Sequence, residues 1–570
     1  LGEYKVTDDI IKKSLGEKSS SVLALDKYQE VKGEVFTNQL KFVSKIESLF
    51  TAVNNQLIEQ EGVTDEDISN LIYHSTQNNT LKFTKKSIQL AFDEGNEIGK
   101  SKAKLVTENL SWLFVRDDLT SKENLSDILN GKKADINASL LRNKGFDKNK
   151  FGEYLLSITK KSTKGFVSNN GWLLFVLSLL TACIGVLLNV LPDLKKYPGI
   201  KNDGIYKSAA TNRGWIGVLV GTFLIGFYIL LYWFPYYITT WIVMVEPLKK
   251  ALSGGEASQW FLYGLMYTLA MLVMGVRMLI KYRHNKYQIF RTISVMFFQL
   301  GFAFLIPEIL VKLNQPEFNF ANMWPLDYDF FFEWNLNKLR NSGGLGLFML
   351  VWGIALFAIG VPIFVYFFGK RWYCSWVCGC GGLAETLGDP YRQLSNKTLK
   401  AWKVERWLIH GVLVFAVIMT GLVLYTYFSG NSEVFGLNSF SIRKTYGFLI
   451  GSVFSGVVGT GFYPLFGNRT WCRFGCPLAA YLGLVPVQNE SGVFKSRSRL
   501  SKIGPARVRS KLYMAAVVSS QYNQDIARQK HRLLENGKSK MQALGAAMRK
   551  LVQICFGVIK NQTAYCPQVT

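Results

Sequence analysis

The chain has 570 residues, a formal net charge of +26 and 49% hydrophobic residues. This length excludes a single domain. The charge is unevenly distributed: residues 1–170 carry 25 Lys and Arg against 24 Asp and Glu, residues 171–486 carry 26 against 13, and residues 487–570 carry 15 against 3. The sequence therefore predicts three regions. Because the sequence begins at Leu1 rather than at Met, we also expect an upstream piece.

Residues 1–170 have the pattern of a polar, mainly helical region. Thr, Ser and Asp, which favour helix caps, precede periodic apolar residues in segments such as NLIYHSTQNNTLKFTKKSIQLAFDEG and DDLTSKENLSDILNG. The region contains no glycine fingerprint, metal-ligand spacing or nucleophile motif. Its role is therefore not predicted from the sequence.

Seven apolar runs follow, and each is about 20 residues long, the length that a helix needs to cross a bilayer. They cover about 171–191, 214–235, 258–280, 291–312, 344–369, 408–429 and 446–466. A buried helix of a soluble domain would explain one run but not seven. The sequence therefore predicts a mainly α-helical protein: a polytopic membrane helix bundle of about seven spans, with a helical polar N-terminal region and a helical basic C-terminal tail.

The loops after the first, third and fifth runs are rich in Lys and Arg, whereas the alternate loops are poor in cations or acidic. Short cation-rich loops stay in the cytoplasm. We therefore expect a multi-pass protein of the cell inner (cytoplasmic) membrane, surrounded by membrane lipid, with these loops and the C-terminal tail cytoplasmic. Seven spans would place residues 1–170 outside. An upstream span, or a miscount at the short apolar segment 236–246, would reverse this, so the side of that region stays open.

Two C-x3-C pairs directly follow apolar runs: Cys374 and Cys378 in YCSWVCGC, and Cys472 and Cys476 in TWCRFGCP, with Cys380 as an additional thiol. One predicted span, 408–429, lies between the two spans that the pairs follow, so both pairs lie at the same, cytoplasmic face. Iron–sulfur clusters are held by four Cys thiolates, and the reducing cytoplasm argues against structural disulfides. The pattern favours an iron–sulfur electron-transfer site. A thiol–disulfide relay without iron is the alternative.

Several neighbours of the cysteines bear on this site. Cys374 and Cys378 would share one face if a helix continues through them. Arg371 and Arg473 would lower thiol pKa values and offset the negative charge of a cluster. His410, early in the sixth run, would tune or ligate a centre, or be hydrogen-bonded between helices.

The segments GKRWYCSWVCGCGGLAETLGDPYRQLS and GFYPLFGNRTWCRFGCPLAAYLGL resemble the NapH/NosR-type 4Fe–4S membrane ferredoxins, over about residues 210–484. The resemblance implies a membrane electron-transfer subunit, in which electrons pass between a quinone or flavin partner and cytoplasmic Fe–S centres, with electron donor or acceptor proteins as partners. It assigns the cofactor, a 4Fe–4S cluster, to four ligands: Cys374, Cys378, Cys472 and Cys476. Gly379 replaces the usual Pro after the first pair, and Cys380 is an extra candidate for cofactor binding, which leaves the ligand set open.

A ferredoxin-like domain with two C-x2-C-x2-C-x3-C runs normally follows in that family. Here only Cys555 and Cys566 follow Cys476, and their spacing differs from such a run. We therefore expect electron transfer to be impaired by the loss of this domain.

The basic tail, about residues 478–567, resembles the C-terminal domain of DEDD-type insertion-sequence transposases with a catalytic serine, through AAYLGLVP, LSKIGPARVRSKLYMAA and GKSKMQALGAAMRKL. The resemblance implies Ser491 as the nucleophile, and contacts of Arg507, Arg509 and Lys511 with nucleic acid, DNA or RNA, through residues 487–570. A polybasic segment on anionic lipid would explain the charge but not the pattern. Membrane helices stand where the acidic nuclease domain should precede the tail. DNA binding is therefore the alternative function, and transposition is not expected.

The two resemblances meet at the string PLAAYLGL, which suits both. The predicted organisation is residues 1–170 as a polar helical region, 171–477 as a transmembrane 4Fe–4S-type electron-transfer domain, and 478–570 as a truncated transposase-like domain. A chimera formed by recombination at a short shared string, or an error of sequence assembly, would produce such a junction.

Overall fold

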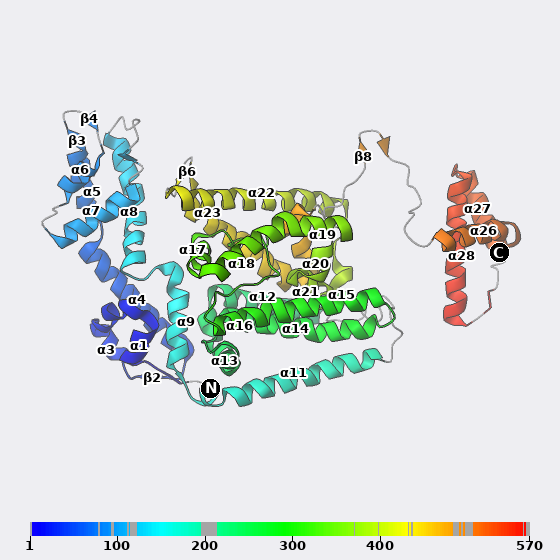
Figure 1. The fold of residues 1–570 in the computed structure, drawn as a ribbon, viewed down its shortest axis with the longest axis horizontal. Coiled ribbons are helices and arrows are strands. Elements are labelled where there is room, and N and C mark those ends of the chain that lie inside the picture. Colours follow the sequence, from blue (N-terminus) through cyan, green and yellow to red (C-terminus); the bar gives the residue numbers. More distant parts are fainter. Residues whose placement is uncertain are drawn as a thin grey trace. The chain divides into compact units, whose positions relative to one another are not determined.

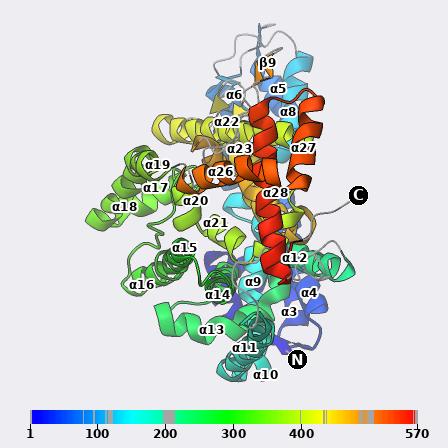
Figure 2. The same ribbon diagram turned by 90° about the vertical axis from the view of Figure 1, so that its right-hand side faces the viewer.

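The computed structural model describes all residues except 1–2, 78–79, 82, 93–95, 111–112, 115–121, 195–213, 370, 397, 431–432, 435–436, 483–489, 492–493, 496–505, 563 and 566–570. It is mainly helical, as predicted. It divides into two units, Leu1–Pro486 and Val487–Thr570 (Figures 1 and 2). The basic loop predicted after the first apolar run lies outside the described residues.

The N-terminal region of the first unit is a set of helices with a small antiparallel sheet. The sheet has the order β2-β1-β5, and Tyr4 pairs with both Phe36 and Thr163. Thr84 caps α6 by accepting a hydrogen bond from the Ser87 N–H, as the cap pattern predicted. The elements are β1 (Glu3–Lys5), α1 (Asp8–Leu15), η1 (Gly16–Lys18), α2 (Ser19–Leu23), α3 (Asp26–Val31), β2 (Val35–Phe36), α4 (Gln39–Glu61), α5 (Asp65–Ser75), β3 (Thr76–Gln77), β4 (Thr80–Leu81), α6 (Lys85–Ala91), α7 (Glu97–Leu110), α8 (Lys122–Asn143), η3 (Lys148–Lys150), α9 (Phe151–Ser162), β5 (Thr163–Lys164) and α10 (Phe166–Asn169).

Five helices in the described residues are long and apolar enough to cross a membrane. They are Trp215–Trp233 (α12), Gln259–Lys281 (α14), Lys286–Lys312 (α15, Lys286–Phe297; η5, Phe298–Leu305; α16, Ile306–Lys312), Gly343–Phe368 (α18, Gly343–Ala355; η6, Leu356–Gly360; α19, Val361–Phe368) and Lys400–Ser429, within α22 (Leu399–Ser429). They coincide with the second to sixth predicted runs, and the axes of α14 and α22 lie roughly parallel, with opposite chain directions, in Figure 1.

The first and seventh predicted runs are helical but are not among these five. The first is α11 (Gly171–Leu194), in which the apolar part Gly171–Gly185 is shorter than the five spanning helices. The seventh is a π-helix, η8 (Gly447–Gly461), between α23 (Ser439–Tyr446) and α24 (Tyr463–Phe466). The short apolar segment 236–246 forms η4 (Pro235–Ile238) and the start of α13 (Thr239–Ser253).

The N-terminal region packs against the connection between α12 and α14. Lys160 of α9 forms ion pairs with Glu246 of α13 (3.0 Å) and with Glu256 (3.2 Å). The Gln39 side chain donates to the Tyr236 carbonyl. One apolar core continues from α4 and α9 into α12 and α13.

The remaining short elements connect the long helices or form the second unit. In the first unit they are α17 (Glu333–Asn341), α20 (Trp372–Trp376), α21 (Gly379–Glu385), η7 (Asp389–Leu394), β6 (Glu433–Val434), β7 (Leu437–Asn438), η9 (Trp471–Gly475) and α25 (Pro477–Tyr481). In the second they are β8 (Glu490–Ser491), β9 (Phe494–Lys495), α26 (Ala506–Tyr522), α27 (Gln524–Glu535) and α28 (Lys540–Asn561). The three helices of the second unit share a small core of Ala516, Ile526, Leu544 and Ala547.

Candidate metal centre

Both cysteine motifs begin with the same sharp turn. Gly369 ends α19 with φ 91°, and Gly467 ends α24 with φ 92°. Side-chain-bearing residues rarely adopt this backbone. The first cysteine of each pair then lies in a short helix: Cys374 in α20 and Cys472 in η9.

The second cysteine of each pair lies at the N-cap of the next short helix, Cys378 before α21 and Cys476 before α25. The Cys378 N–H donates to the Tyr373 carbonyl (2.9 Å), and the Cys476 N–H donates to the Trp471 carbonyl (3.0 Å). The condition under which Cys374 and Cys378 would share one helix face, a helix that continues through both, is therefore not met. The break directs backbone N–H groups of a new helix at the second thiol. They lower the pKa of Cys378 and of Cys476, although burial outweighs them at Cys476.

The two motifs form an internal repeat longer than C-x3-C. The segments FGKRWYCSWVC and FGNRTWCRFGC share a Phe-Gly pair, an arginine, an aromatic residue and both cysteines at the same spacing. The shared arginines are Arg371 and Arg469. This signal was present in the sequence, but the spacing of the cysteines alone did not capture it.

The structure brings the cysteines of both motifs to one cavity of about 410 Å³. Its lining includes Cys374, Cys378, Cys380, Cys472 and Cys476. The seven cysteines in the described part of the chain all have free thiols.

Cations dominate the charged side chains around this cavity. Arg371, Arg392, Arg469 and Arg473 line it, and Glu405 is the one acid among its lining residues. Arg473 donates to Glu405 at 3.0 and 2.6 Å. Four thiolates and a cluster carry net negative charge, and this lining offsets it.

The donor set and the volume of the cavity fit a cluster held by four cysteines. Among the described residues, no three His, Cys, Asp or Glu side chains converge on a point that could hold one metal ion. A 4Fe–4S cluster has four irons with one cysteine each, so its ligands surround a volume instead of meeting at a point. Four cysteines around this cavity fit that arrangement.

Burial has the largest effect on the pKa values of three of the thiols. It raises the pKa of Cys472 to about 11 and raises the pKa values of Cys374 and Cys476 well above their usual range. Arg469 lowers the pKa of Cys374 and of Cys472 by less than burial raises it. The expectation that nearby cations lower these pKa values is therefore wrong here, because desolvation outweighs them.

Cys378 differs from these thiols. Its pKa is lowered, and the largest cause is a hydrogen bond with the Cys380 thiol. Burial acts in the opposite direction, and the backbone N–H groups of Gly381 and Cys380 lower the pKa further. The same hydrogen bond, together with burial, raises the pKa of the Cys380 thiol well above its usual range. The two thiols thus behave as one coupled pair.

His410 lies on α22 with an exposed side chain, and its Nδ1 is 2.7 Å from the Arg406 carbonyl oxygen. It is not among the residues that line the cysteine cavity. This hydrogen bond lies within α22, whereas the alternative predicted from the sequence was a hydrogen bond between helices.

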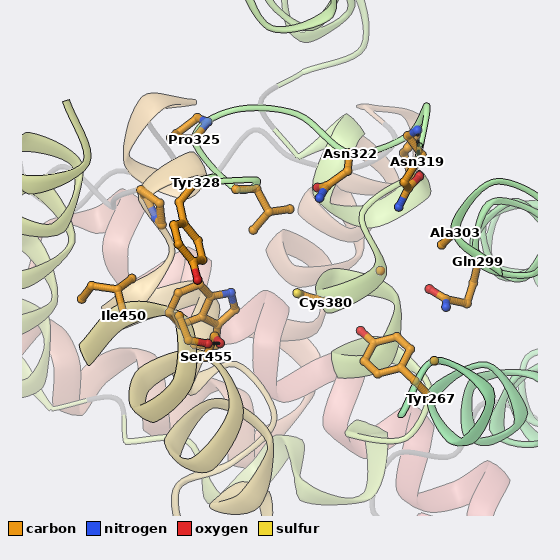
Figure 3. A pocket seen from close by; sticks show the side chains of 18 of the residues that line it. Tyr267, Gln299, Ala303, Asn319, Asn322, Pro325, Tyr328, Cys380, Ile450 and Ser455 are labelled. Atoms are coloured by element: carbon orange, nitrogen blue, oxygen red, sulfur yellow. Dashed lines mark hydrogen bonds between the residues drawn. The ribbon is translucent and has the colours of Figure 1, made fainter. Parts of the chain in front are cut away.

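A second cavity, of about 420 Å³, shares Cys380 with the first (Figure 3). Its polar lining is uncharged and consists of the tyrosines 232, 263, 267, 328, 373 and 446, the amides Gln299, Asn319 and Asn322, and Ser455. Figure 3 shows Cys380 between Tyr328 on one side and Tyr267 on the other. The Tyr373 hydroxyl donates to the Ala321 carbonyl (2.5 Å) and so joins the cysteine segment to the loop that covers this cavity.

The predicted nucleic-acid residues lie in the second unit. Ser491 is in β8, and Arg507 and Arg509 are in α26; the side chains of these three lie outside the described part. Lys511 is exposed on α26.

Two families match different parts of the chain. A 4Fe-4S binding domain matches residues 348–398 and 448–486, which include both C-x3-C pairs. The transposase IS116/IS110/IS902 family matches residues 468–532. The two matches overlap over residues 468–486, and together they support the predicted chimera and a 4Fe–4S cluster as the cofactor.

Curated relatives match only through a short stretch. The chain is 36% identical over 91 residues to the pilin gene-inverting proteins of Moraxella lacunata and Moraxella bovis. The match covers 15% of this chain, and the chain spans 28% of the length of these relatives. No solved structure matches.

Proposed function

We propose that residues 171–486 form a membrane electron-transfer subunit whose 4Fe–4S cluster is ligated by Cys374, Cys378, Cys472 and Cys476 at the cytoplasmic face. The observation that carries this proposal is the repeat of one cysteine-bearing turn around a single arginine-lined cavity. When bound, the cluster supplies one-electron transfer. The protein supplies four thiolates, excludes water by burying Cys378 and Cys476 to 5% exposure, and offsets negative charge with arginines.

The proposed orientation rests on charge and connectivity. The cysteine segments follow helices whose connections carry the basic residues, which favours their cytoplasmic side. Lys160 pairs with residues between α12 and α14, at the opposite ends of these helices from the short basic connection between α14 and α15. This contact supports an extracytoplasmic position for residues 1–170.

The redox partner that we propose at the second cavity is a quinone. The uncharged lining suits a neutral ring, and the tyrosine hydroxyls and amides suit hydrogen bonds to its two oxygens. Cys380 lies in the wall between this cavity and the cysteine cavity, which gives a short path for electrons.

Anaerobic purification of the full chain, with measurement of iron, acid-labile sulfide and the electron paramagnetic resonance (EPR) of the dithionite-reduced protein, tests the cluster. We expect Cys374→Ser and Cys472→Ser to lose iron and sulfide. Cys183→Ser serves as the control, because Cys183 is exposed on α11 and does not line the cavity. A reducible crosslink between the motifs without any iron would instead support the thiol–disulfide relay.

DNA binding by the tail is a second proposed function, favoured by the family match over residues 468–532. Exposed cations such as Lys511 would contact phosphates. We propose binding without strand cleavage, because membrane helices precede the tail. Binding of the full chain to labelled duplex DNA should weaken steeply as salt rises, and salt-independent or undetectable binding would contradict it.

A further inference from the structure

Glu385, at the end of α21, is a buried acid with three arginine partners. Its side chain is 8% exposed. Its Oε2 lies 3.1 Å from Arg291 Nη2 and 2.9 Å from Arg392 Nη2, and its Oε1 contacts Arg469 Nη2. None of the roles predicted from the sequence includes this residue.

The three arginines come from elements that are far apart in the sequence. Arg291 belongs to α15, Arg392 to η7, and Arg469 to the turn of the second cysteine motif, three residues before Cys472. Glu385 itself follows the first cysteine motif. The carboxylate therefore ties the two cysteine motifs to each other and to the bundle.

A second acid completes the network. Asp389 accepts from Lys281 (2.7 Å) and pairs with Arg392 (3.0 Å). Two carboxylates thus face four cations, and the network keeps an excess of positive charge. The two carboxylates are buried, at 8% and 4% exposure, so solvent screens them weakly, whereas Arg392 is 43% exposed and is screened more.

Two members of this network also face the cysteines. Arg392 and Arg469 line the cysteine cavity, whereas Glu385 does not. A cation beside a cluster favours the reduced form, which carries one more negative charge, and a carboxylate that binds the cation weakens this effect. The position of each guanidinium therefore influences the reduction potential.

We propose that Glu385 is a positioning residue that binds Arg392 and Arg469 beside the cysteines, offsets part of their positive charge and thereby lowers the reduction potential of the cluster. This inference rests on the proposed electron-transfer function. It assigns a role to a carboxylate that neither ligates iron nor lines the cavity.

A potentiometric titration of the full chain, followed by EPR with dithionite as reductant, tests this role. Glu385→Gln keeps the shape of the side chain and removes the negative charge, so we expect iron and sulfide to remain. At a fixed potential, the ratio of reduced to oxidised cluster should rise at least tenfold, equivalent to ~59 mV for one electron. Arg469→Gln removes the cation and should shift the ratio in the opposite direction.

Glu308→Gln is the matched control. Glu308 is a buried acid with 9% side-chain exposure, paired with Lys249 at 2.5 Å, and it lines neither the cysteine cavity nor its neighbour. It should leave the potential unchanged. A shift in Glu385→Gln no larger than in Glu308→Gln would overturn the role of Glu385.

Two further outcomes separate this inference from the proposed function. Wild-type protein without iron and sulfide would overturn both, whereas a wild-type cluster with an unshifted Glu385→Gln potential overturns only the role of Glu385. If Glu385→Gln does not fold, Arg469→Lys replaces it, because lysine keeps the charge but lacks the fork that contacts the carboxylate. A wild-type potential in Arg469→Lys would then overturn the inference, and a shifted one would support it.

Discussion

At the scale of single residues, the glycines before the cysteines determine where the thiols point. A Cβ on Gly467 would lie 2.6 Å from the Ser395 backbone nitrogen, and the residue has φ 92°. Both observations exclude a side chain. Gly411, on α22, has open space within 4 Å of the position that a Cβ would occupy, and so tolerates one.

We expect Gly467→Ala to destabilise the second motif. The left-handed backbone alone costs about 1–3 kcal/mol for a residue with a side chain, and the contact with Ser395 adds to this. Iron content per chain and the thermal midpoint should both fall, whereas Gly411→Ala should behave as wild type. Equal iron content in the two variants would contradict this role of Gly467.

Cys380 is the cysteine without a counterpart in the repeat. Leu478 occupies the equivalent position after the second pair, where it is fully buried. A site that uses one cysteine pair from each copy of the repeat does not need a fifth thiol.

We therefore expect Cys380→Ser to keep its iron, its sulfide and its EPR signal, because four ligands remain. Its rate of electron exchange with added quinone should fall, since Cys380 lies in the wall between the two cavities. Loss of the cluster in Cys380→Ser, with the cluster retained in Cys378→Ser, would show that Cys380 is the ligand instead.

At the scale of elements, the glycine-rich π-helix η8 allows close packing beside the cysteines. A Cβ on Gly456 would lie 2.7 Å from the Tyr232 ring, and one on Gly459 would lie 2.9 Å from Trp471 Cβ. Small residues permit such close approach of membrane helices. The helix therefore joins α12 to the second cysteine motif.

We expect Gly456→Val to weaken this packing by about 1–3 kcal/mol, the usual cost of overfilling a packed core. The thermal midpoint of the detergent-solubilised protein should fall. Gly226→Val, on α12, is the control, because no atom lies within 4 Å of its Cβ position. Equal midpoints for the two variants would contradict the close packing of η8.

At the scale of the whole first unit, a buried ion pair fastens residues 1–170 to the bundle. The side chains of Lys160 and Glu246 are 10% and 13% exposed. An unpaired buried charge costs about 3–5 kcal/mol. Without Lys160, Glu246 keeps Lys250 (3.6 Å) and the Ala257 N–H (2.9 Å), so we expect a cost below that range.

We expect Lys160→Met to loosen this attachment, so that amide hydrogen exchange in α9 and α13 becomes faster. Lys13→Met removes an exposed pair with Asp9, whose side chains are 67% and 70% exposed, and should change nothing. Unchanged exchange in both variants would show that the apolar core alone holds the two regions together.

The proposed topology predicts different labelling of the two ends of the chain. In a chain whose Cys183, Cys555 and Cys566 are replaced by serine, Thr51→Cys should react with a membrane-impermeant maleimide in intact cells. Lys511→Cys should react only after the cells are permeabilised. Labelling of Thr51→Cys only after permeabilisation would place residues 1–170 in the cytoplasm.

The apolar runs of the sequence predicted the long helices better than they predicted the geometry within each helix. Runs of apolar residues predicted the helical class and five of the long helices, because a bilayer sets a minimum length for a span. The same criterion did not predict that Gly447–Gly461 is a π-helix, because the length of an apolar run does not distinguish the hydrogen-bond pattern of a π-helix from that of an α-helix.

The sequence by itself determined that two cysteine pairs follow long apolar runs and that a basic tail of different origin follows them, because spacing, hydropathy and charge are properties of the linear chain. The tertiary structure decided which cysteines share a cavity, that burial outweighs the nearby cations at most of the thiols, and that Glu385 meets Arg291, Arg392 and Arg469. These features depend on residues up to 178 positions apart (Arg291 to Arg469) being packed together out of water, and no local pattern encodes that proximity.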